Sequence, residues 1–386
     1  MLLVVEQRFL RTPDGKVWTA GHYSYEFLQR YATHADQILV LGRIIDVCSE
    51  PLNSRPSSGP MVNHVQLPNY NGLLGLIASF YSISKGIFSA CGASDIAIIR
   101  APSVIGSVTR RIMQMQKKSV GVEVIGDPFD VFAPGVFHHP LRCILRHASQ
   151  WMLLQDCRSA TAVCYVTKTT LQDRYPTDSP AFGVSDCELP SEAYATKPRL
   201  FCTPNGLKLV HVGTMSQQYK GQDLIMEAMR RALNIRPEMS LSLELVGDGK
   251  YRSQFEKLAN TLGLEKYVTF HGFVGDSNAL RQILDDSDLL VFPSRTEGLP
   301  RSIIEAMARG LPCIASRVGG IHELIDKEYL VPSNDANALS ELIVRLAFAP
   351  CEMKSMSEKN YSRSHEFAIE PSRNIFKLFL EAIVIH

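Results

Sequence analysis

The sequence predicts an α/β protein with two doubly wound domains, and three observations support this fold class. The chain has 386 residues, a length at which two domains of ordinary size are expected. Short apolar runs, which are typical of buried strands, alternate with helical stretches along the chain. This alternation stops over 174–205, which is rich in Pro, Ser and Asp, and then restarts. We therefore expect a first domain over 1–195, a linker over 196–206 and a second domain over 207–365.

The first domain opens with an apolar strand at 2–5, followed by a polar loop that contains Gly15 and Gly21. Further strands, each short and apolar or alternating, are expected at 37–41, 62–67, 95–100, 121–125 and 161–166. The helices between them are expected at 23–31, 73–90, 106–117 and 140–160. Strand and helix alternate as in a parallel sheet.

The second domain repeats the same order of elements. Its strands are expected at 207–212, 240–246, 267–271, 289–292 and 312–316. Its helices are expected at 224–233, 251–262, 278–284, 302–309 and 322–325. A last helix, amphipathic over 371–385, belongs to a C-terminal segment at 366–386.

The stretch from residue 294 to 310, SRTEGLPRSIIEAMARG, has the pattern of an anion site. A buried strand leads into a polar loop, and Pro300 suits the first position of the following helix because its missing N–H costs nothing there. The first turn of such a helix leaves N–H groups unpaired, with positive dipole charge behind them. Phosphate is the anion most often bound at such a junction. Glu297 and Glu305 lie on either side of it.

Lys220 opens a helix after the first strand of the second domain. Ligands of open α/β sheets bind outside the carboxyl ends of the strands. Lys220 is therefore expected near the Glu297 loop, where its ammonium would neutralise a diphosphate. From this stretch alone, a solvated lysine at a helix start is the favoured interpretation. The turn Gly247-Asp248-Gly249 needs no ligand either.

Composition excludes several classes of protein. Lys plus Arg number 40 against 39 Asp plus Glu, which is unlike the basic excess of a nucleic-acid binder. Nine scattered cysteines without a C-x-x-C pair suggest reduced, buried thiols in the cytosol. No apolar run is long enough to predict a signal peptide or a membrane span. We expect a cytoplasmic protein.

Five segments of the second domain together resemble a known family. They read VGT…KGQDLIMEA, LVGDG, VTFHGFV, DLLVFPSRTEGLPRSIIEAMARGLPCIAS and VGGIHELI, and they extend over 207–326. In order and spacing they are similar to the nucleotide-sugar-binding half of glycosyltransferase family 4, which has the GT-B fold. The resemblance implies a metal-independent, cofactor-free enzyme that transfers a hexose-type sugar from a nucleotide diphosphate sugar to an acceptor hydroxyl. It also implies retention of configuration, a role in polysaccharide or glycoconjugate biosynthesis, and a C-terminal helix that crosses back to the first domain.

The resemblance assigns roles to residues. Glu305 would bind the ribose hydroxyls, Glu297 would contact the transferred sugar, and Lys220 would bind phosphate. Gly298 and Leu299 would offer amides to the diphosphate, and Phe273 and Val274 would pass the nucleobase. The predicted donor-binding set is Gly213, Thr214, Lys220, Phe273, Val274, Glu297, Gly298, Leu299, Pro300, Arg301 and Glu305.

One position departs from the family. An arginine usually follows the glycine of the first strand in this domain, and Thr214 stands there instead. Half of the cationic clamp is therefore missing. Arg295, Arg301 and Arg317 are candidates to compensate.

The first domain carries weaker signals. Family members often have a Gly-Gly loop after the first strand, and this chain has only the single glycines at 15 and 21. Asp127 is the titratable group at the end of the fifth strand. It either acts in catalysis by holding a sugar hydroxyl or acceptor, or starts a turn before Pro128. His138-His139 and His22 are more typical of surface or capping positions.

Two further patterns have simple explanations. Asp286-Ser287-Asp288 spells the metal-binding D-x-D string, but a helix end at the far edge of the sheet explains it better. Six basic residues on the helices of the first domain suggest a peripheral membrane contact for a lipid-linked acceptor, with ordinary solvated faces as the simpler interpretation. They are Arg110, Arg111, Lys117, Lys118, Arg142 and Arg146. A carbohydrate or small-molecule acceptor remains equally open.

Two other functions are compatible with this fold. A nucleotide-sugar epimerase or an inverting transferase would need a dedicated base in the cleft, and no strong candidate is present. The protein could also be a catalytically silent binding or scaffold homologue. The one feature that favours this is Thr214, which stands where the family usually has an arginine.

Overall fold

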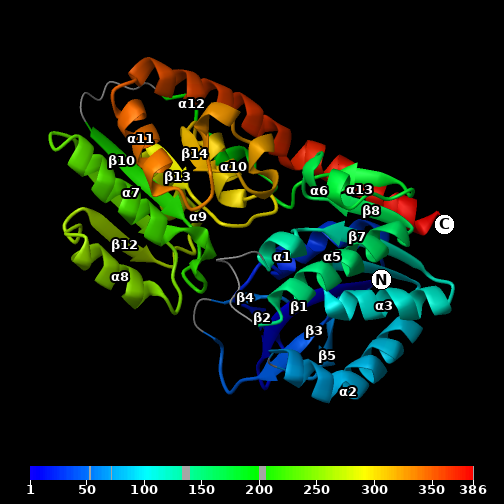
Figure 1. The fold of residues 1–386 in the computed structure, drawn as a ribbon. Helices are drawn as coiled ribbons and strands as arrows, with labels where there is room; N and C mark the ends of the chain where they lie inside the picture. The colour runs from blue at the N-terminus through cyan, green and yellow to red at the C-terminus, as the bar shows by residue number, and fades with distance from the viewer. Residues whose placement is uncertain (52–53, 71, 133–139, 200–205, 386) are drawn as a thin grey trace. The chain divides into compact units, whose positions relative to one another are not determined.

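A computed structural model of the chain describes residues 1–51, 54–70, 72–132, 140–199 and 206–385. The chain folds into two compact units. The first unit comprises Met1–Pro128, His147–Val184 and Arg373–His386, and the second comprises Phe129–Arg146 and Ser185–Ser372. Each unit contains one sheet, parallel in its central strands, together with helices (Figure 1). The fold is therefore the predicted α/β type with two doubly wound sheets, the architecture called GT-B.

The sheet of the first unit is built on five central parallel strands. These are β5 (Val62–Leu67), β3 (Ile38–Asp46), β1 (Leu2–Arg11), β6 (Ile96–Ala101) and β7 (Ser119–Val124), in that spatial order. Two more parallel strands, β8 (Ala162–Tyr165) and β9 (Ala181–Gly183), extend the β7 edge. The chain order reverses between β1 and β6, which is the switch point of this sheet.

Strand β1 is longer than the sequence predicts. Its pairing with β3 shifts register between Val4 and Arg8, and the strand then continues to Arg11. A turn at Gly15 (φ +81°) joins it to the antiparallel strand β2 (Val17–Thr19), which pairs with β4 (Arg55–Pro56). The expected polar loop is therefore a β-hairpin, and the bulge that makes it possible has no signature in the local composition.

Helices separate the strands of this unit. They are α1 (Tyr25–Leu28), α2 (Gly72–Gly92), α3 (Val104–Met115), the greater part of α5 (Arg142–Arg158) and α6 (Thr170–Arg174). The short helix α4 (Pro128–Val131) and the first turn of α5 fall almost entirely in the segment that belongs to the second unit. The helix expected at 23–31 is split into α1 and a 3₁₀ segment, Gln29–His34.

The C-terminal helix α13 (Ile369–Val384) packs into the core of the first unit. Phe376, Phe379 and Ile383 are buried there together with residues of β1 and β6. Gly121 on β7 makes room for them, because a Cβ at this position would lie 2.2 Å from Ile383 Cδ1. The end of the chain, from Arg373 onward, is therefore part of the unit formed by the N-terminal strands.

The second unit has six parallel strands in the spatial order β12-β11-β10-β13-β14-β15. They are β10 (Gly206–Val212), β11 (Ser240–Val246), β12 (Val268–Gly272), β13 (Leu289–Phe292), β14 (Cys313–Ser316) and β15 (Leu330–Val331). In chain order this is 3-2-1-4-5-6, the doubly wound order, which reverses between β10 and β13.

The helices of the second unit are α7 (Gln222–Ile235), α8 (Arg252–Thr261), α9 (Ser277–Asp285), α10 (Arg301–Ala308), α11 (Ala336–Ala347) and α12 (Pro350–Ser364). The helix expected at 322–325 is instead a 3₁₀ segment, Gly319–Glu323, because its first residues are tied to a neighbouring loop. Helices α11 and α12 were not among the predicted elements.

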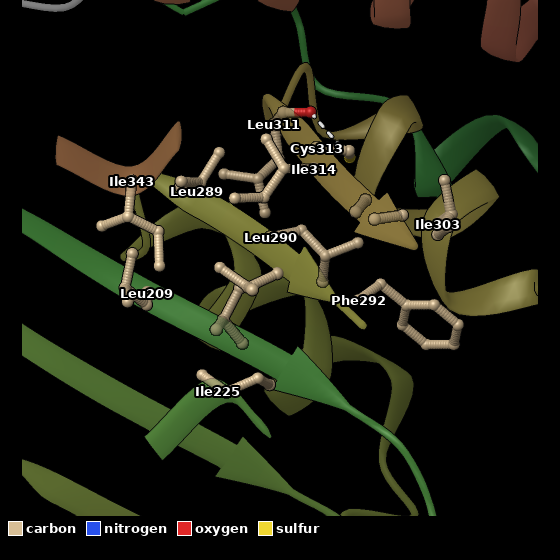
Figure 2. Close-up of a cluster of buried hydrophobic side chains, with 14 of the residues drawn as sticks. Leu209, Ile225, Leu289, Leu290, Phe292, Ile303, Leu311, Cys313, Ile314 and Ile343 are labelled. Atoms are coloured by element: carbon tan, nitrogen blue, oxygen red, sulfur yellow. Dashed lines mark hydrogen bonds between the residues drawn. The ribbon is translucent and has the colours of Figure 1, made fainter. Parts of the chain in front are cut away.

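The core of this unit lies where β10, β13 and β14 meet helices α7, α10 and α11. Figure 2 shows Leu209, Leu290 and Ile314 of the three strands in one buried cluster with Ile225 and Ile303 of the helices. All five are fully buried. Such burial stabilises the sheet by about 1.5–3 kcal/mol per side chain, so the strand ends that surround the switch point are held firmly.

Candidate functional site

The candidate site lies at the carboxyl edge of the second sheet, where its strand order reverses. Strands β10 and β13 are neighbours here, with Leu209 opposite Leu289 and Val210 opposite Leu290. Each sends a loop to the same edge, 213–221 after β10 and 293–300 after β13. Consecutive crossovers diverge at such a point, and open α/β sheets bind their ligands there.

Lys220 and Glu297, one from each loop, form an ion pair at this point. Lys220 Nζ lies 2.6 Å from Glu297 Oε1, and the side chains are only 15% and 9% exposed. The ammonium also lies 5.0 Å from the ring centre of Tyr219 and 5.2 Å from that of Phe292. Burial by itself would lower the pKa of Lys220, but the adjacent Glu297 carboxylate outweighs it and the pKa is raised. Lys220 is therefore a firmly charged cation.

Backbone contacts fix the two loops against each other. The carbonyl oxygen of Tyr219 accepts hydrogen bonds from Arg295 N (2.7 Å) and Ser294 Oγ (3.1 Å). Gly221 adopts φ +79°, and a Cβ there would lie 2.3 Å from the carbonyl oxygen of Pro293. Only glycine permits this approach. The position of Lys220 is thus determined by its glycine neighbour.

A third loop, from the end of β14, closes over the Glu297 loop. Gly320 N donates to the carbonyl oxygen of Gly298 at 2.8 Å. A Cβ on Gly319, which adopts φ +50°, would lie 1.9 Å from the carbonyl oxygen of Glu297. Both carbonyls are therefore turned toward this third loop. Among the residues that the structure describes, the amide groups of Gly298 and Leu299 have no acceptor.

Helix α10 begins directly after these amides. Pro300 occupies the N-cap position, and the helix carries Glu305 one turn above Arg301. The Arg301 Nη2 to Glu305 Oε1 distance is 3.7 Å. Burial raises the pKa of Glu305, and the positive charges of Arg301 and Arg281 only partly oppose this. The loop and the helix start thus present the amides of Gly298 and Leu299 and one carboxylate, the combination expected for phosphate and ribose.

Arg295 is one of the three arginines that could replace the cation missing at Thr214. Its guanidinium is instead bound to neighbouring side chains. Its guanidinium makes two hydrogen bonds to Asp223, of 3.0 and 2.7 Å. A third, of 2.6 Å, goes to Asn334 Oδ1. Arg301 is held close to Glu305. Arg317 is exposed at the end of β14.

Thr214 takes part in a turn of its own. Its Oγ1 accepts from Ser216 N at 3.1 Å and donates to the carbonyl oxygen of Asp248 at 3.3 Å. Gly247 and Gly249 permit this contact, because a Cβ on either would lie 2.1 Å from an atom of the Gly213–Ser216 segment. The GDG turn therefore has a structural role, which is to support the loop that leads to Lys220.

The predicted nucleobase contacts lie further along the edge. Phe273 and Val274 follow β12, the edge strand, and the Phe273 side chain is half exposed. The carbonyl oxygen of Gly272 accepts a hydrogen bond from Gly247 N at 2.8 Å, which joins this end to the GDG turn. Phe273 and Val274 are therefore connected to the Lys220 loop through the backbone of the GDG turn.

His211 lies within β10, below the Lys220 loop, and is fully buried. Its Nδ1 is 3.0 Å from the carbonyl oxygen of Val291, and its ring stacks on Phe292. Its Nε2 has no hydrogen-bond partner in the described part of the chain. Burial lowers the pKa of His211 to about 4; the Val291 carbonyl opposes this shift, and the charge of Lys220 adds to it. The imidazole is therefore neutral at neutral pH.

Acidification is expected to destabilise the second unit through His211. The unfolded chain binds a proton here below pH 6.5, whereas the folded protein excludes it down to about pH 4. Because the unfolded state takes up more protons, stability falls as the pH drops through this window, by up to about 3 kcal/mol. Urea unfolding at neutral pH and at about pH 4 measures the loss. His211→Asn should show a smaller loss, and an equal loss in this variant would contradict the assignment.

Asp127, predicted at the end of β7, is buried and engaged within the first unit. It accepts a hydrogen bond from Tyr175 Oη at 2.5 Å and forms an ion pair with Arg174. This arrangement favours the structural alternative for Asp127 over a role in catalysis. His138 and His139 lie outside the described residues. His22 packs its ring against Phe27, with centroids 4.0 Å apart.

The first unit has a polar cluster at its own switch point that sequence reasoning missed. Glu6, on the bulge of β1, accepts from Ser103 Oγ (3.2 Å) and from Ile105 N (3.3 Å) at the start of α3. Tyr70 Oη lies 3.3 Å from Glu6, and the Arg43 guanidinium lies over the Tyr70 ring. The serine before a helix was the only signal available in the sequence.

The basic residues predicted as one surface are divided by the structure. Arg110 is buried in an ion pair with Asp156, 2.7 Å long. Lys118 donates to the carbonyl oxygens of Cys91 and Ser94, each at 2.7 Å. Arg146 is likewise bonded to the chain, at the carbonyl oxygen of Phe129. Arg110, Lys118 and Arg146 are therefore bonded within the fold, and the membrane contact suggested for the six residues stays a prediction.

Asp286 and Asp288 lie at the amino edge of the second sheet, before β13. Asp288 Oδ2 accepts from Lys208 N at 2.8 Å, and Asp286 Oδ1 accepts from the Gln282 side chain at 2.9 Å. Asp288 thus stabilises the start of β13 against β10, and Asp286 stabilises the end of α9. Within the described ranges, no group of three His, Cys, Asp or Glu side chains is arranged to hold a metal ion.

Comparison with known proteins finds similar sequences and structures. Residues 206–347 match the model of the family described as glycosyl transferases group 1. The chain is 29% identical over 365 residues to protein CapJ of Staphylococcus aureus, covering 94% of this chain and 88% of CapJ. It is 31% identical over 144 residues to the putative colanic acid biosynthesis glycosyltransferase WcaL of Escherichia coli, covering 35% of this chain and 34% of WcaL.

Solved structures share the fold along the whole chain. The crystal structure of HepE from Anabaena, in complex with UDP and glucose, superposes with a TM-score of 0.67 at 16% identity. The match covers 100% of this chain and 99% of HepE. The chain is therefore a glycosyltransferase with the GT-B fold, and its residues 206–347 are similar to the glycosyl transferases group 1 family.

Proposed function

We propose that this chain is a retaining glycosyltransferase of family 4, which moves a hexose-type sugar from a nucleotide diphosphate sugar to an acceptor hydroxyl. The observation that carries the proposal is the pair Lys220–Glu297 at the switch point, beside the unpaired amides of Gly298 and Leu299. One cation and a helix N-terminus suit a diphosphate, and a carboxylate beside them suits sugar hydroxyls. The nucleotide and sugar bound to HepE support the same class of donor.

Each residue has a distinct role in this proposal. Lys220 leaves Glu297 when the donor binds and places its ammonium on the diphosphate. Glu297 then accepts hydrogen bonds from the transferred sugar. Gly298 and Leu299 donate their amides to the phosphate oxygens, and Glu305 accepts from the ribose hydroxyls. Gly213, Thr214, Pro300 and Arg301 shape the pocket, and Phe273 and Val274 pass the nucleobase.

The reaction breaks the bond from the anomeric carbon to the diphosphate oxygen and forms one to the acceptor oxygen. The acceptor proton passes to the departing diphosphate, so the products are the glycoside and a free nucleoside diphosphate. Attack from the face that the diphosphate leaves preserves the anomeric configuration and needs no protein nucleophile. Negative charge grows on the diphosphate in the transition state, where Lys220 and the α10 N-terminus stabilise it.

The same groups make a divalent ion unnecessary in the proposed site. Lys220 is firmly charged, since the Glu297 carboxylate raises its pKa despite burial. The helix dipole adds positive potential at α10. We therefore propose transfer that requires neither metal nor organic cofactor.

The acceptor belongs to polysaccharide or glycoconjugate assembly in this proposal. The similarity to WcaL, which is described by its role in colanic acid biosynthesis, supports it. A carbohydrate, lipid-linked or small-molecule hydroxyl suits the reaction equally. We propose a cytoplasmic enzyme, where nucleotide sugars are made.

Donor turnover tests this function. The protein is incubated with a panel of UDP-, GDP- and ADP-sugars in EDTA, and free nucleoside diphosphate is measured. Release from one donor is expected, and NMR of the released sugar or glycoside should show the donor's anomeric configuration. Absence of release with every donor would contradict an active enzyme and leave a silent homologue. Inversion would contradict the retaining mechanism alone.

Replacing Thr214 by arginine is expected to strengthen nucleoside diphosphate binding. Thr214 is exposed at the end of β10, where the family carries a second cation. A charge-assisted hydrogen bond there should lower the dissociation constant by about tenfold. Calorimetric titration measures this, with Thr214→Gln as the uncharged control of similar length. Equal affinity of the two variants would show that this position does not face the diphosphate.

A further inference from the structure

Helix α2 has an apolar stripe that the first unit does not cover. Leu74, Ile77, Tyr81 and Phe88 are 83%, 62%, 80% and 61% exposed. They recur at helical spacing, so they share one side of the helix, and Phe80, which is half exposed, lies beside them. A soluble domain rarely exposes so many large apolar side chains on one element.

The other side of α2 is an ordinary core face. Ile83, Ile87 and Cys91 are buried in the first unit, and Leu67 of β5 packs against Gly86. Lys118 fastens the C-terminal end by donating to the carbonyl oxygens of Cys91 and Ser94. By length and composition alone, residues 74–92 are apolar enough to cross a membrane, which corrects the expectation that no apolar run of the chain is long enough. Their core contacts hold the helix on the unit, with the second apolar side turned outward.

The surroundings of this stripe are basic and almost free of acid. Between residues 51 and 122 the sequence contains a single carboxylate, Asp95, which lies beyond the end of α2. Lys85 stands on the stripe itself, and α3, which contacts α2, contributes exposed Arg111. Lys117, also exposed, follows α3. An apolar stripe combined with several cations is the pair of signals that stable membrane association requires.

We propose that the exposed stripe of α2, flanked by Lys85, Arg111 and Lys117, docks the enzyme in the interface of an anionic lipid bilayer. The apolar side chains enter the boundary between headgroups and acyl chains, and the cations contact lipid phosphates. Aromatic side chains such as Tyr81 and Phe88 are favoured at this depth. The helix lies in the plane of the membrane, because its opposite side remains in the protein core.

A second copy of the chain fits this face less well. In a symmetric pair, each stripe would bring Lys85, Arg111 and Lys117 close to the same residues of its partner. Neither α2 nor α3 carries a carboxylate to neutralise them. Like charges facing each other oppose such a contact, whereas anionic headgroups supply the missing negative charge.

Vesicle partitioning of the full chain, without donor, tests this proposal independently of the enzyme's reaction. Vesicles of phosphatidylcholine alone are compared with vesicles of equal parts phosphatidylcholine and phosphatidylglycerol, and bound protein is measured by flotation. Strong binding is expected only with phosphatidylglycerol. Ile77→Glu/Phe88→Glu should lower the partition coefficient by about tenfold or more. Lys117→Gln should lower it about fivefold.

Matched controls distinguish binding through this surface from nonspecific adsorption of the protein to vesicles. Tyr267→Glu removes a half-exposed aromatic side chain from the second unit and should leave binding unchanged. Because Ile77 and Phe88 are exposed, the double variant should fold, which its circular dichroism and melting temperature verify. Phe88→Trp should show a blue shift of its added emission with the anionic vesicles. Alkaline carbonate should release the bound protein.

Three results would overturn the proposal. Equal partitioning of wild type and the double variant would show that α2 is not the contact. Retention after carbonate would indicate a spanning helix. A dimer in light scattering that the double variant converts to monomer, without vesicle binding, would identify a second copy as the occupant.

Discussion

Lys220→Ala is expected to lower kcat/KM for sugar transfer by about 10²–10³-fold, with most of the loss in kcat. The ammonium lies 2.6 Å from Glu297, and the proposed reaction requires it to meet the charge that grows on the departing diphosphate. A neutral side chain leaves only the amides of Gly298 and Leu299 and the α10 dipole for that purpose. Release of nucleoside diphosphate at saturating and at low donor concentrations measures both constants.

Arg317→Gln is the matched control for this substitution. It removes a cation from the same edge of the sheet, but one that is exposed on the β14 loop. Its kcat/KM should stay close to that of wild type. Lys220→Ala leaves the buried carboxylate of Glu297 without its ion-pair partner Lys220. A second variant, Lys220→Ala/Glu297→Gln, avoids this by replacing the carboxylate with a neutral amide. Because Glu297 itself meets the sugar in the proposed reaction, this double variant is compared by its binding of nucleoside diphosphate. Wild-type affinity in the double variant would refute the proposed role of Lys220.

Glu123→Ala is expected to destabilise the first unit by about 3–5 kcal/mol. Glu123 and Arg100, on neighbouring strands β7 and β6, are 5% and 2% exposed. Arg100 Nη1 donates to Glu123 Oε2 at 2.9 Å and to Tyr31 Oη at 3.1 Å. Removing the carboxylate breaks the ion pair that Glu123 makes with this buried guanidinium. Urea unfolding measures the effect through the change in midpoint and slope.

The comparison for this second variant is Asp46→Ala. Asp46 pairs with Arg11 at 2.7 Å, a similar length, but both side chains face solvent. Exposed pairs contribute little to stability, so this variant should unfold almost as wild type does. If both substitutions lowered the free energy of unfolding equally, burial would not be the reason for the destabilisation by Glu123→Ala.

Much of the second unit could be predicted from sequence because its determinants are local. The strand, loop and helix around Glu297 follow from an apolar run, a polar loop, Pro300 and a final glycine. The meeting of Lys220 with Glu297 follows from strand order, which the alternating pattern implies. The close approach of Gly319 to the Glu297 loop could not be predicted from the sequence. It depends on backbone contact between loops that are distant in the chain.

The first unit was harder to predict because its key features are not local. The bulge at Glu6 lengthens β1 by shifting its pairing with β3, and no composition marks it. The sequence allows either a catalytic or a structural role for Asp127. Its contacts with Arg174 and Tyr175 depend on the folding of distant segments and cannot be predicted locally. Arg295 illustrates the same limit: its charge suggested a phosphate ligand, but its partner Asp223 lies on a separate helix.

Equilibrium titration of UDP, GDP and ADP in EDTA probes the proposed diphosphate site without relying on turnover. We predict that one of these nucleotides binds without metal, and that Lys220→Ala weakens its binding by about tenfold or more. Failure of all three to bind, binding that appears only when a divalent ion is added, or unchanged affinity in Lys220→Ala would contradict a diphosphate site built from Lys220 and the α10 N-terminus.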